Sequence, residues 1–217
     1  MSEETNSKNA VEINDLRISF DGNEILKGVD LTLRNEENLV VLGKSGTGKS
    51  VLIKCIVGLL RPDSGSIKVF DNEVTELEKR KLDEVRKDIG FLFQSGALYD
   101  SMTVRQNLEF PLRRIKKDLT DDEIDAKVKE ALENVSLPDA IDKMPSELSG
   151  GMRKRVGLAR TIIVDPKIIL YDEPTTGLDP ITSDEISRLI LDIQKKFKTA
   201  SIIITHDIEC AKTVADR

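Results

Sequence analysis

The sequence is poor in the residue types that bind nucleic-acid bases. Tryptophan is absent, and aromatic residues make up 4% of the 217 residues, so platforms for base stacking are poorly supplied. Acidic residues outnumber basic ones by 39 to 33, which gives a net charge of −6. Because nucleic acid favours basic surfaces, it is not expected to be a partner.

Cysteines and long apolar runs are also scarce. Cys55 and Cys210 lack a metal-type spacing and lie in apolar helical contexts, which favours free thiols in a reducing cytosol. The first eight residues are polar and lack the apolar stretch of a signal peptide. No run approaches the roughly 20 apolar residues that cross a bilayer. The sequence therefore predicts a cytoplasmic protein, and in a membrane process another chain would have to span the bilayer.

Strand-like and helix-like segments alternate along most of the chain. An antiparallel hairpin is predicted around Asp21-Gly22-Asn23, between strands Val11–Phe20 and Glu24–Leu33. A helix at Lys49–Leu60 follows the first of four short apolar strands, and helical segments also follow the last two. The four strands are Leu39–Leu42, Ile89–Phe93, Ile168–Tyr171 and Ser201–Thr205. The predicted fold is α/β, with a mostly parallel sheet covered by helices on both faces and an N-terminal antiparallel β segment.

The strand pattern is interrupted between Gln94 and Asp165. A capping box begins at Thr120, and apolar residues then recur at helical spacing. We interpret residues 95–165 as an α-helical subdomain inserted into a core of residues 11–94 and 166–217. Residues 1–10 are predicted to be a flexible tail.

A glycine-rich segment between an apolar strand and a helix matches the pattern G-x-x-x-x-G-K-[ST]. Glycines let backbone N–H groups curl around phosphate, and the helix N-terminus adds its positive dipole. Lys49 is predicted to reach the β- and γ-phosphates of ATP, and the Ser50 hydroxyl to bind Mg²⁺. This P-loop predicts a P-loop NTPase core with ATP and Mg²⁺ as cofactors. Its predicted nucleotide-binding residues are Gly43, Lys44, Ser45, Gly46, Thr47, Gly48, Lys49, Ser50 and Val51.

Two adjacent carboxylates, Asp172 and Glu173, end the apolar strand that starts at Ile168. Because side chains alternate along a strand, the two cannot serve the same atom. Asp172 is predicted to bind the hydrated Mg²⁺ through water. Glu173 is then free to act as the general base for the water that attacks the γ-phosphate.

Two further polar residues follow core strands. His206, the single histidine, comes directly after Ser201–Thr205, and Gln94 follows Ile89–Phe93. Open α/β sheets gather their ligand contacts at the carboxyl ends of their strands. His206 is predicted to donate to a γ-phosphate oxygen, and Gln94 to bridge Mg²⁺ and the attacking water.

A second glycine-rich helix start lies at Leu148–Met152, with Ser149 as the N-cap of a helix to about Val164. It is a second phosphate-binding surface in a chain with one P-loop. Its sequence, Leu-Ser-Gly-Gly-Met, resembles the signature of ABC ATPases. The other motifs follow in that family's order, from about Val11 to the end of the chain. Gln94 matches the Q-loop, Asp179 the D-loop, His206 the H-loop, and Phe20 the aromatic that stacks on adenine.

The resemblance implies that two subunits pack head to tail, so that each ATP is shared between them. The ATP on Lys49 of one subunit would contact the other subunit's Ser149, Gly150, Gly151 and Met152. Hydrolysis would open the dimer because the γ-phosphate holds it together. The implied partners are a second ATPase subunit, making a homodimer, and an integral-membrane permease. The chain would then lie on the inner face of the cell membrane.

Within the family, the chain most resembles the ATPase of Mla/Mce-type systems, which move phospholipids. Met152 stands where the family usually has Gln, and similar segments are Gly48–Ile53, Phe93–Val104, Asn107–Leu112 and Gly177–Ile181. A Mce-type substrate-binding protein is then an expected member of the complex. Since the family continues into further strands, and the last helical pattern (Asp207–Asp216) has no glycine stop, we expect residues 1–217 to be a shortened form.

Alternative functions remain open. The chain could energise transport of another substrate, such as an amino acid or a lipoprotein, or serve as a regulatory ATPase outside transport. ATPases of DNA repair and chromosome packing separate the P-loop from the signature by long coiled coils, and this sequence has no such heptad run. The basic clusters are interpreted as solvated helix faces. They are Lys79–Lys81, Arg113-Arg114, Lys116-Lys117 and Arg153–Arg155.

Overall fold

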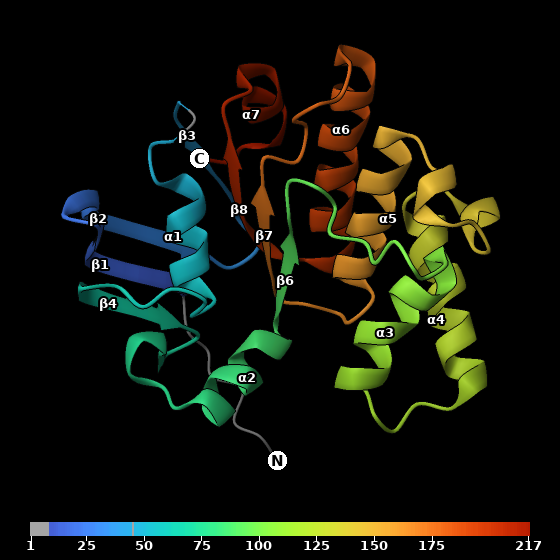
Figure 1. Ribbon diagram of the computed structural model, residues 1–217, viewed down its shortest axis with the longest axis horizontal. Helices are drawn as coiled ribbons and strands as arrows, with labels where there is room; N and C mark the ends of the chain where they lie inside the picture. The colour runs from blue at the N-terminus through green and yellow to red at the C-terminus, as the bar shows by residue number, and fades with distance from the viewer. Residues whose placement is uncertain (1–8, 45) are drawn as a thin grey trace.

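Two four-stranded sheets organise the chain in a computed structural model that describes residues 9–44 and 46–217. The antiparallel sheet has the order β2-β1-β4-β5, and the second sheet, which is parallel throughout, has the order β3-β8-β7-β6. Figure 1 shows the antiparallel sheet and α1 on one side of the parallel sheet, with α5 and α6 on the other. The predicted fold class is confirmed.

The strands of the antiparallel sheet are β1 (Asn9–Phe20), β2 (Asn23–Arg34), β4 (Ser64–Val69) and β5 (Asn72–Glu73). The hairpin between the first two turns on Asp21 and Gly22, both with positive φ (50° and 78°), as a two-residue type I′ turn requires. Ala10 is fully buried in β1. Residues 9 and 10 therefore belong to the sheet rather than to the predicted tail, whose residues 1–8 lie outside the described residues.

The parallel sheet and its helices alternate along the chain. The strands are β3 (Asn38–Leu42), β6 (Ile89–Leu92), β7 (Ile168–Asp172) and β8 (Ala200–Thr205). The helices of the core are α1 (Lys49–Ile56), α2 (Lys79–Lys87), α6 (Pro180–Phe197) and α7 (Ile208–Val214). Side chains alternate between the faces of this sheet. Ile168 and Leu170 contribute to a core with α1, whereas Ile169 and Tyr171 contribute to a core with α5 and α6.

The segment from Gln94 to Asp165 holds no strand. Its helices are α3 (Val104–Ile115), α4 (Asp121–Asn134) and α5 (Gly150–Ile162), with short 3₁₀ turns at Pro138–Ala140 and Pro145–Glu147. The predicted capping box is present, since Thr120 accepts from the Glu123 backbone and Glu123 from that of Thr120. Figure 1 shows α3 and α4 at the edge of the molecule farthest from the antiparallel sheet.

Three predicted helices end earlier than expected. Gly58 (φ 64°) ends α1 in the left-handed conformation, short of Leu60. Asp165 also has positive φ (58°), and α5 ends at Ile162. After α7, the backbone pairs with β3: Asp216 N donates to Asn38 O (2.9 Å). This extended pairing replaces the predicted helical end.

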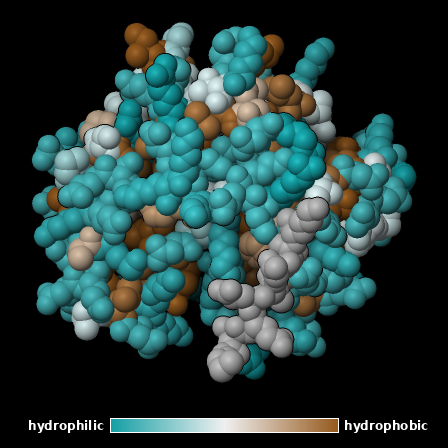
Figure 2. Space-filling model, turned by 180° about the vertical axis from the view of Figure 1, so that it is seen from behind, coloured by the Kyte–Doolittle hydropathy of each residue, from teal (hydrophilic) through white to brown (hydrophobic). Residues whose placement is uncertain are grey.

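The surface is largely hydrophilic. Seen from behind, hydrophobic residues form small groups between charged and polar ones (Figure 2). Among residues 9–44 and 46–217, no helix has the length and hydropathy needed to cross a bilayer. Cys55 and Cys210 are both free thiols and both buried, and burial raises the pKa of Cys55 to about 11.

Candidate active site

A cavity of about 510 Å³ opens at the carboxyl ends of the parallel strands. It collects residues from six separate places in the sequence, because parallel strands present these ends on one edge of the sheet. Its lining residues are Phe20, Ile25, Gly46, Gly48, Lys49, Ser50, Val51, Gln94, Glu173, Thr176 and His206. The structure thus brings together most of the predicted nucleotide-binding and catalytic residues.

The P-loop joins β3 to the first residue of α1, Lys49. Gly48 is the N-cap in a left-handed conformation (φ 91°), and a Cβ there would lie 2.8 Å from Ile25 Cγ2. Glycine is therefore required both by the backbone and by the close approach. Gly43, Lys44 and Thr47 form the rest of the turn, in which Thr47 Oγ1 donates to Lys44 O (2.9 Å). Ser45 lies outside the described residues.

Lys49 is held over the cavity by three oxygen atoms. Its Nζ donates to the carbonyl oxygens of Gly43 (2.6 Å) and Lys44 (2.9 Å), and it lies 3.5 Å from Glu173 Oε1. Only 7% of the lysine side chain and 12% of the glutamate side chain are exposed. The ammonium group of Lys49 therefore already faces the cavity, and the carboxylate of Glu173 is one of its three oxygen partners.

Ser50 and Asp172 meet beside this pair. Ser50 Oγ donates to Asp172 Oδ1 at 2.7 Å, so the hydroxyl at the start of α1 touches the carboxylate at the end of β7. Hydroxyl and carboxylate oxygens are the hard ligands that Mg²⁺ prefers. The donor set fits Mg²⁺, although among the described residues no group of three or more Asp, Glu, His or Cys side chains is placed so that these side chains alone could hold a metal ion.

Glu173 is the most heavily contacted carboxylate of the site. His206 Nδ1 lies 2.7 Å from Oε2, and Thr176 Oγ1 donates to the same oxygen at 3.1 Å. Since a carboxylate only accepts, His206 carries its proton on Nδ1 in this contact. The backbone of Glu173 has positive φ (51°), an uncommon conformation for a residue with a side chain. Such outliers cluster at functional sites.

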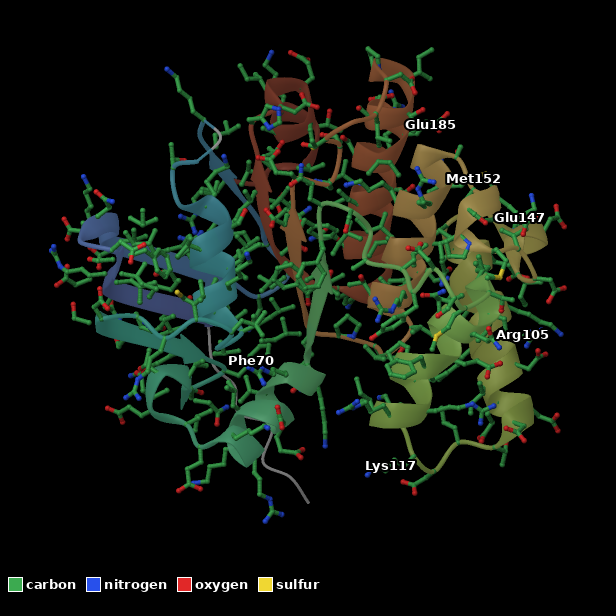
Figure 3. All side chains as sticks on the ribbon, viewed as in Figure 1. Phe70, Arg105, Lys117, Glu147, Met152 and Glu185 are labelled. Carbon is green, nitrogen blue, oxygen red and sulfur yellow. The ribbon has the colours of Figure 1, made fainter. Side chains whose placement is uncertain are left out.

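The signature segment, Leu148–Met152, forms a separate surface. None of its residues is among the described residues that line the cavity. Ser149 caps α5 as predicted, because its Oγ accepts from Met152 N (3.2 Å). Met152 lies on the helical side of the molecule (Figure 3).

The signature segment packs against the start of α6. A Cβ on Gly151 would lie 2.6 Å from Thr182 Cγ2, and one on Gly150 would lie 3.5 Å from Leu178. Asp179 is the N-cap of α6, and it accepts from Thr182 Oγ1 (2.6 Å) and from backbone N–H groups. These contacts lower the pKa of Asp179, the Thr182 hydroxyl most strongly. The predicted D-loop and signature residues are thus neighbours within one chain.

Ile25 and Thr176 line the cavity without having been predicted to do so, and a third unpredicted residue, Lys154, contacts the site. Lys154, four residues after Gly150, was interpreted as part of a solvated basic cluster, but it is only 5% exposed. Its Nζ donates to the carbonyl oxygens of Gln94 and Glu173, the second at 3.2 Å. Burial lowers its pKa, against the opposing effect of the nearby carboxylates of Asp172 and Glu173. The burial of Lys154 could have been predicted from its position on the helix, because Gly157, Leu158 and Thr161 follow it at helical spacing on the buried face of α5.

Comparisons with known proteins identify the family of the chain. The sequence model of the ABC transporter family matches residues 26–176. The chain therefore belongs to the ABC transporter family, and its fold is that of the family's ATPase domain. The probable ribonucleotide transport ATP-binding protein mkl of Mycobacterium tuberculosis is 45% identical over 207 residues, which is 95% of this chain and 57% of that protein. The methionine import ATP-binding protein MetN of Clostridium tetani is 39% identical, over 95% of this chain and 64% of that protein. The chain spans about three-fifths of the length of these relatives.

Solved structures that are similar to this chain include that of cbiO1 from Clostridium perfringens, which is part of the ABC transporter complex cbiONQ. Its TM-score is 0.88 at 31% identity, over 97% of this chain and 83% of that one. A dimeric post-hydrolysis state of the ATP-binding cassette MJ0796 bound to ADP and Pi has a TM-score of 0.86 at 29% identity, over 94% of this chain and 90% of that one.

Proposed function

We propose that this chain binds and hydrolyses Mg-ATP as one half of a homodimer and thereby drives a membrane permease. The observation that carries the proposal is the convergence of Lys49, Ser50, Asp172, Glu173 and His206 at one cavity. Phe20 lines the same cavity and is 41% exposed, so its ring is available to stack on adenine.

The chemistry follows from the contacts of these residues. When ATP binds, its β- and γ-phosphates replace the carboxylate of Glu173 as the partner of the Lys49 ammonium group. The freed carboxylate accepts the proton of the attacking water, while the bond between the γ-phosphorus and the bridging oxygen of ADP breaks. His206 and Thr176 hold the carboxylate in place. Ser50 would bind Mg²⁺ directly, with Gln94, and Asp172 through water. Bound Mg²⁺ supplies charge neutralisation on the phosphates.

The homodimer is inferred because the signature segment has a phosphate-binding helix start but lies apart from the cavity. In a two-fold arrangement, Ser149, Gly150, Gly151 and Met152 of one subunit complete the site of the other. The MJ0796 cassette is dimeric in its ADP- and Pi-bound state, which supports this arrangement.

The permease would bind at the segment after Gln94. Tyr99 and Phe110 expose 43% and 39% of their surface and pack edge to face. Such exposed aromatic residues are enriched where proteins meet. Attachment to a permease would place the chain at the inner face of the cell membrane.

For the transported substrate, we propose phospholipid, on the resemblance of Met152 and the segments around it to Mla/Mce-type ATPases. A Mce-type substrate-binding protein would then belong to the complex. The names of mkl and MetN favour a second candidate, import of a ribonucleotide or of methionine.

One reconstitution separates these candidates. The chain is purified from its native host with the permease bound to it, and the complex is placed in liposomes with ATP inside. Movement of a fluorescent phospholipid that stops with Glu173→Gln supports the lipid proposal. Uptake of labelled methionine or ribonucleotide, without lipid movement, rejects it in favour of the second candidate.

A further inference from the structure

Lys154 is a buried lysine that none of the roles above uses. Lysine is rarely buried unless its nitrogen is paired, and here the described partners of Nζ are two backbone carbonyl oxygens. One belongs to Gln94, after β6, and the other to Glu173, after β7. A single side chain of α5 therefore holds the two loops that follow neighbouring strands.

The two carbonyl groups belong to Gln94 and Glu173, the two residues proposed to contact the attacking water. Glu173 has its backbone in the left-handed region, which persists only where surrounding contacts hold it. Glu173 N donates to Ile204 O (2.9 Å), and Lys154 binds the carbonyl oxygen of the same residue. The direction of the carboxylate toward Lys49 and His206 depends on this backbone.

Lys154 is also fixed to the signature segment. It lies on the second turn of α5, whose first turn carries Gly150, Gly151 and Met152. A helix is stiff over two turns, so a displacement of its first turn is carried to Lys154.

We propose that Lys154 is a positioning residue that couples the signature segment to the general base of the same chain. The inference rests on the proposed function, in which the signature segment contacts the partner subunit's ATP. Binding of that ATP moves or orders α5, and Lys154 passes the change to the Glu173 and Gln94 backbones. Each subunit then hydrolyses its own ATP efficiently only when its signature segment is also engaged.

The test replaces Lys154 by Met, which keeps the length of the side chain and removes its donors. We expect kcat to fall about 10- to 100-fold, the cost of a misplaced catalytic group, with KM for ATP within about twofold. The Hill coefficient for ATP is expected to fall toward 1, because the link between the two sites is lost. If Lys154 only stabilised the fold, its replacement would change neither kcat nor the Hill coefficient, provided that the protein is folded at the assay temperature.

Arg155→Met is the matched control. Arg155 follows on the same helix and donates to the carbonyl oxygen of Val135, away from the cavity (3.2 Å). We expect it to lower the melting temperature while kcat and the Hill coefficient stay near wild type. Lys154→Gln is the second variant; its amide keeps a donor, so its kcat should lie between those of wild type and Lys154→Met. Thermal unfolding is recorded for each.

Glu173→Gln is assayed in parallel, so that two failures are distinguished. If the wild-type chain does not hydrolyse ATP, the proposed function fails, and if Glu173→Gln hydrolyses ATP at near the wild-type rate, the general base that Lys154 is proposed to position is not Glu173. If Glu173→Gln is inactive but a folded Lys154→Met or Lys154→Gln keeps the kcat and Hill coefficient of wild type, the proposed function stands and the role of Lys154 is rejected.

Discussion

Replacing Glu173 by Gln is predicted to have opposite effects on ATP binding and on hydrolysis. In the structure, Glu173 Oε1 lies 3.5 Å from Lys49 Nζ. At an effective dielectric constant of about 20, two unit charges at this distance attract by about 5 kcal/mol. ATP must displace this carboxylate from the lysine.

The net effect on affinity is smaller than the attraction, because the desolvation of two buried charges offsets most of it. We expect a remainder of about 1–2 kcal/mol, so that Glu173→Gln binds ATP about 5- to 30-fold more tightly. Hydrolysis should fall about 10²- to 10⁴-fold, since an amide cannot accept the proton of water. The variant should therefore accumulate as an ATP-held dimer.

Titration calorimetry measures the affinity for ATP, and the release of phosphate gives the rate of hydrolysis. Size-exclusion chromatography with ATP detects the dimer. Glu84→Gln on α2 is the control, because this exposed carboxylate pairs only with Lys87 among its described partners. Near wild-type hydrolysis by Glu173→Gln would remove the residue from its role. Weaker ATP binding would refute the competition between carboxylate and phosphate for Lys49.

Two further predictions concern His206 and Glu37. His206→Ala should bind ATP with near wild-type affinity, since the P-loop is intact. It should hydrolyse ATP about 10- to 100-fold more slowly, because Glu173 loses its 2.7 Å partner. Full activity would leave His206 without a catalytic role. The guanidinium of Arg217 lowers the pKa of Glu37, so its carboxylate stabilises the fold above its ordinary pKa, and this stability is lost as pH falls through the lowered value. Glu37→Gln should therefore lower the melting temperature at pH 7 by a few degrees and much less near pH 3, as followed by circular dichroism; an equal loss at both pH values would contradict this reasoning.

The meeting of four of the cavity's side chains could be predicted from the sequence because the P-loop motif and the parallel topology together constrain where they lie. The P-loop pattern places Lys49 at a helix start, and parallel strands must bring Gln94, Glu173 and His206 to one edge. These residues are separated by up to 157 positions, from 49 to 206, yet strand ends alone predict their meeting.

Other features could not be predicted from local patterns. The strand β4 and the helix α2 carry few buried residues, with Val85 the one buried position of α2, so their periodicity is weak. Lys154 stands in a basic run that resembles a solvated face. Its helical spacing from buried residues of α5 was a local signal for burial, but its partners, on two loops distant in sequence, could not be predicted. Tertiary contacts, rather than the helix pattern, also ended α7 by pairing Asp216 with β3.

Composite sites in a homodimer are the central claim, and heterodimers of defined arrangement test them most directly. Ser149→Arg blocks the signature segment with a larger side chain, and Lys49→Ala removes the ammonium group of the P-loop. Dual-tagged heterodimers are purified with the two changes on different chains, or with both on one chain beside a wild-type partner. If each site joins one chain's P-loop to the other's signature segment, the first arrangement keeps one intact site, and the second keeps none. We predict that the first heterodimer hydrolyses ATP clearly faster than the second, which should show almost none. The rate of the first should stay below half the wild-type rate, because its chain with the intact P-loop carries the blocked signature segment and so loses the coupling through Lys154. Activity in the second heterodimer, with the first inactive, would contradict the account.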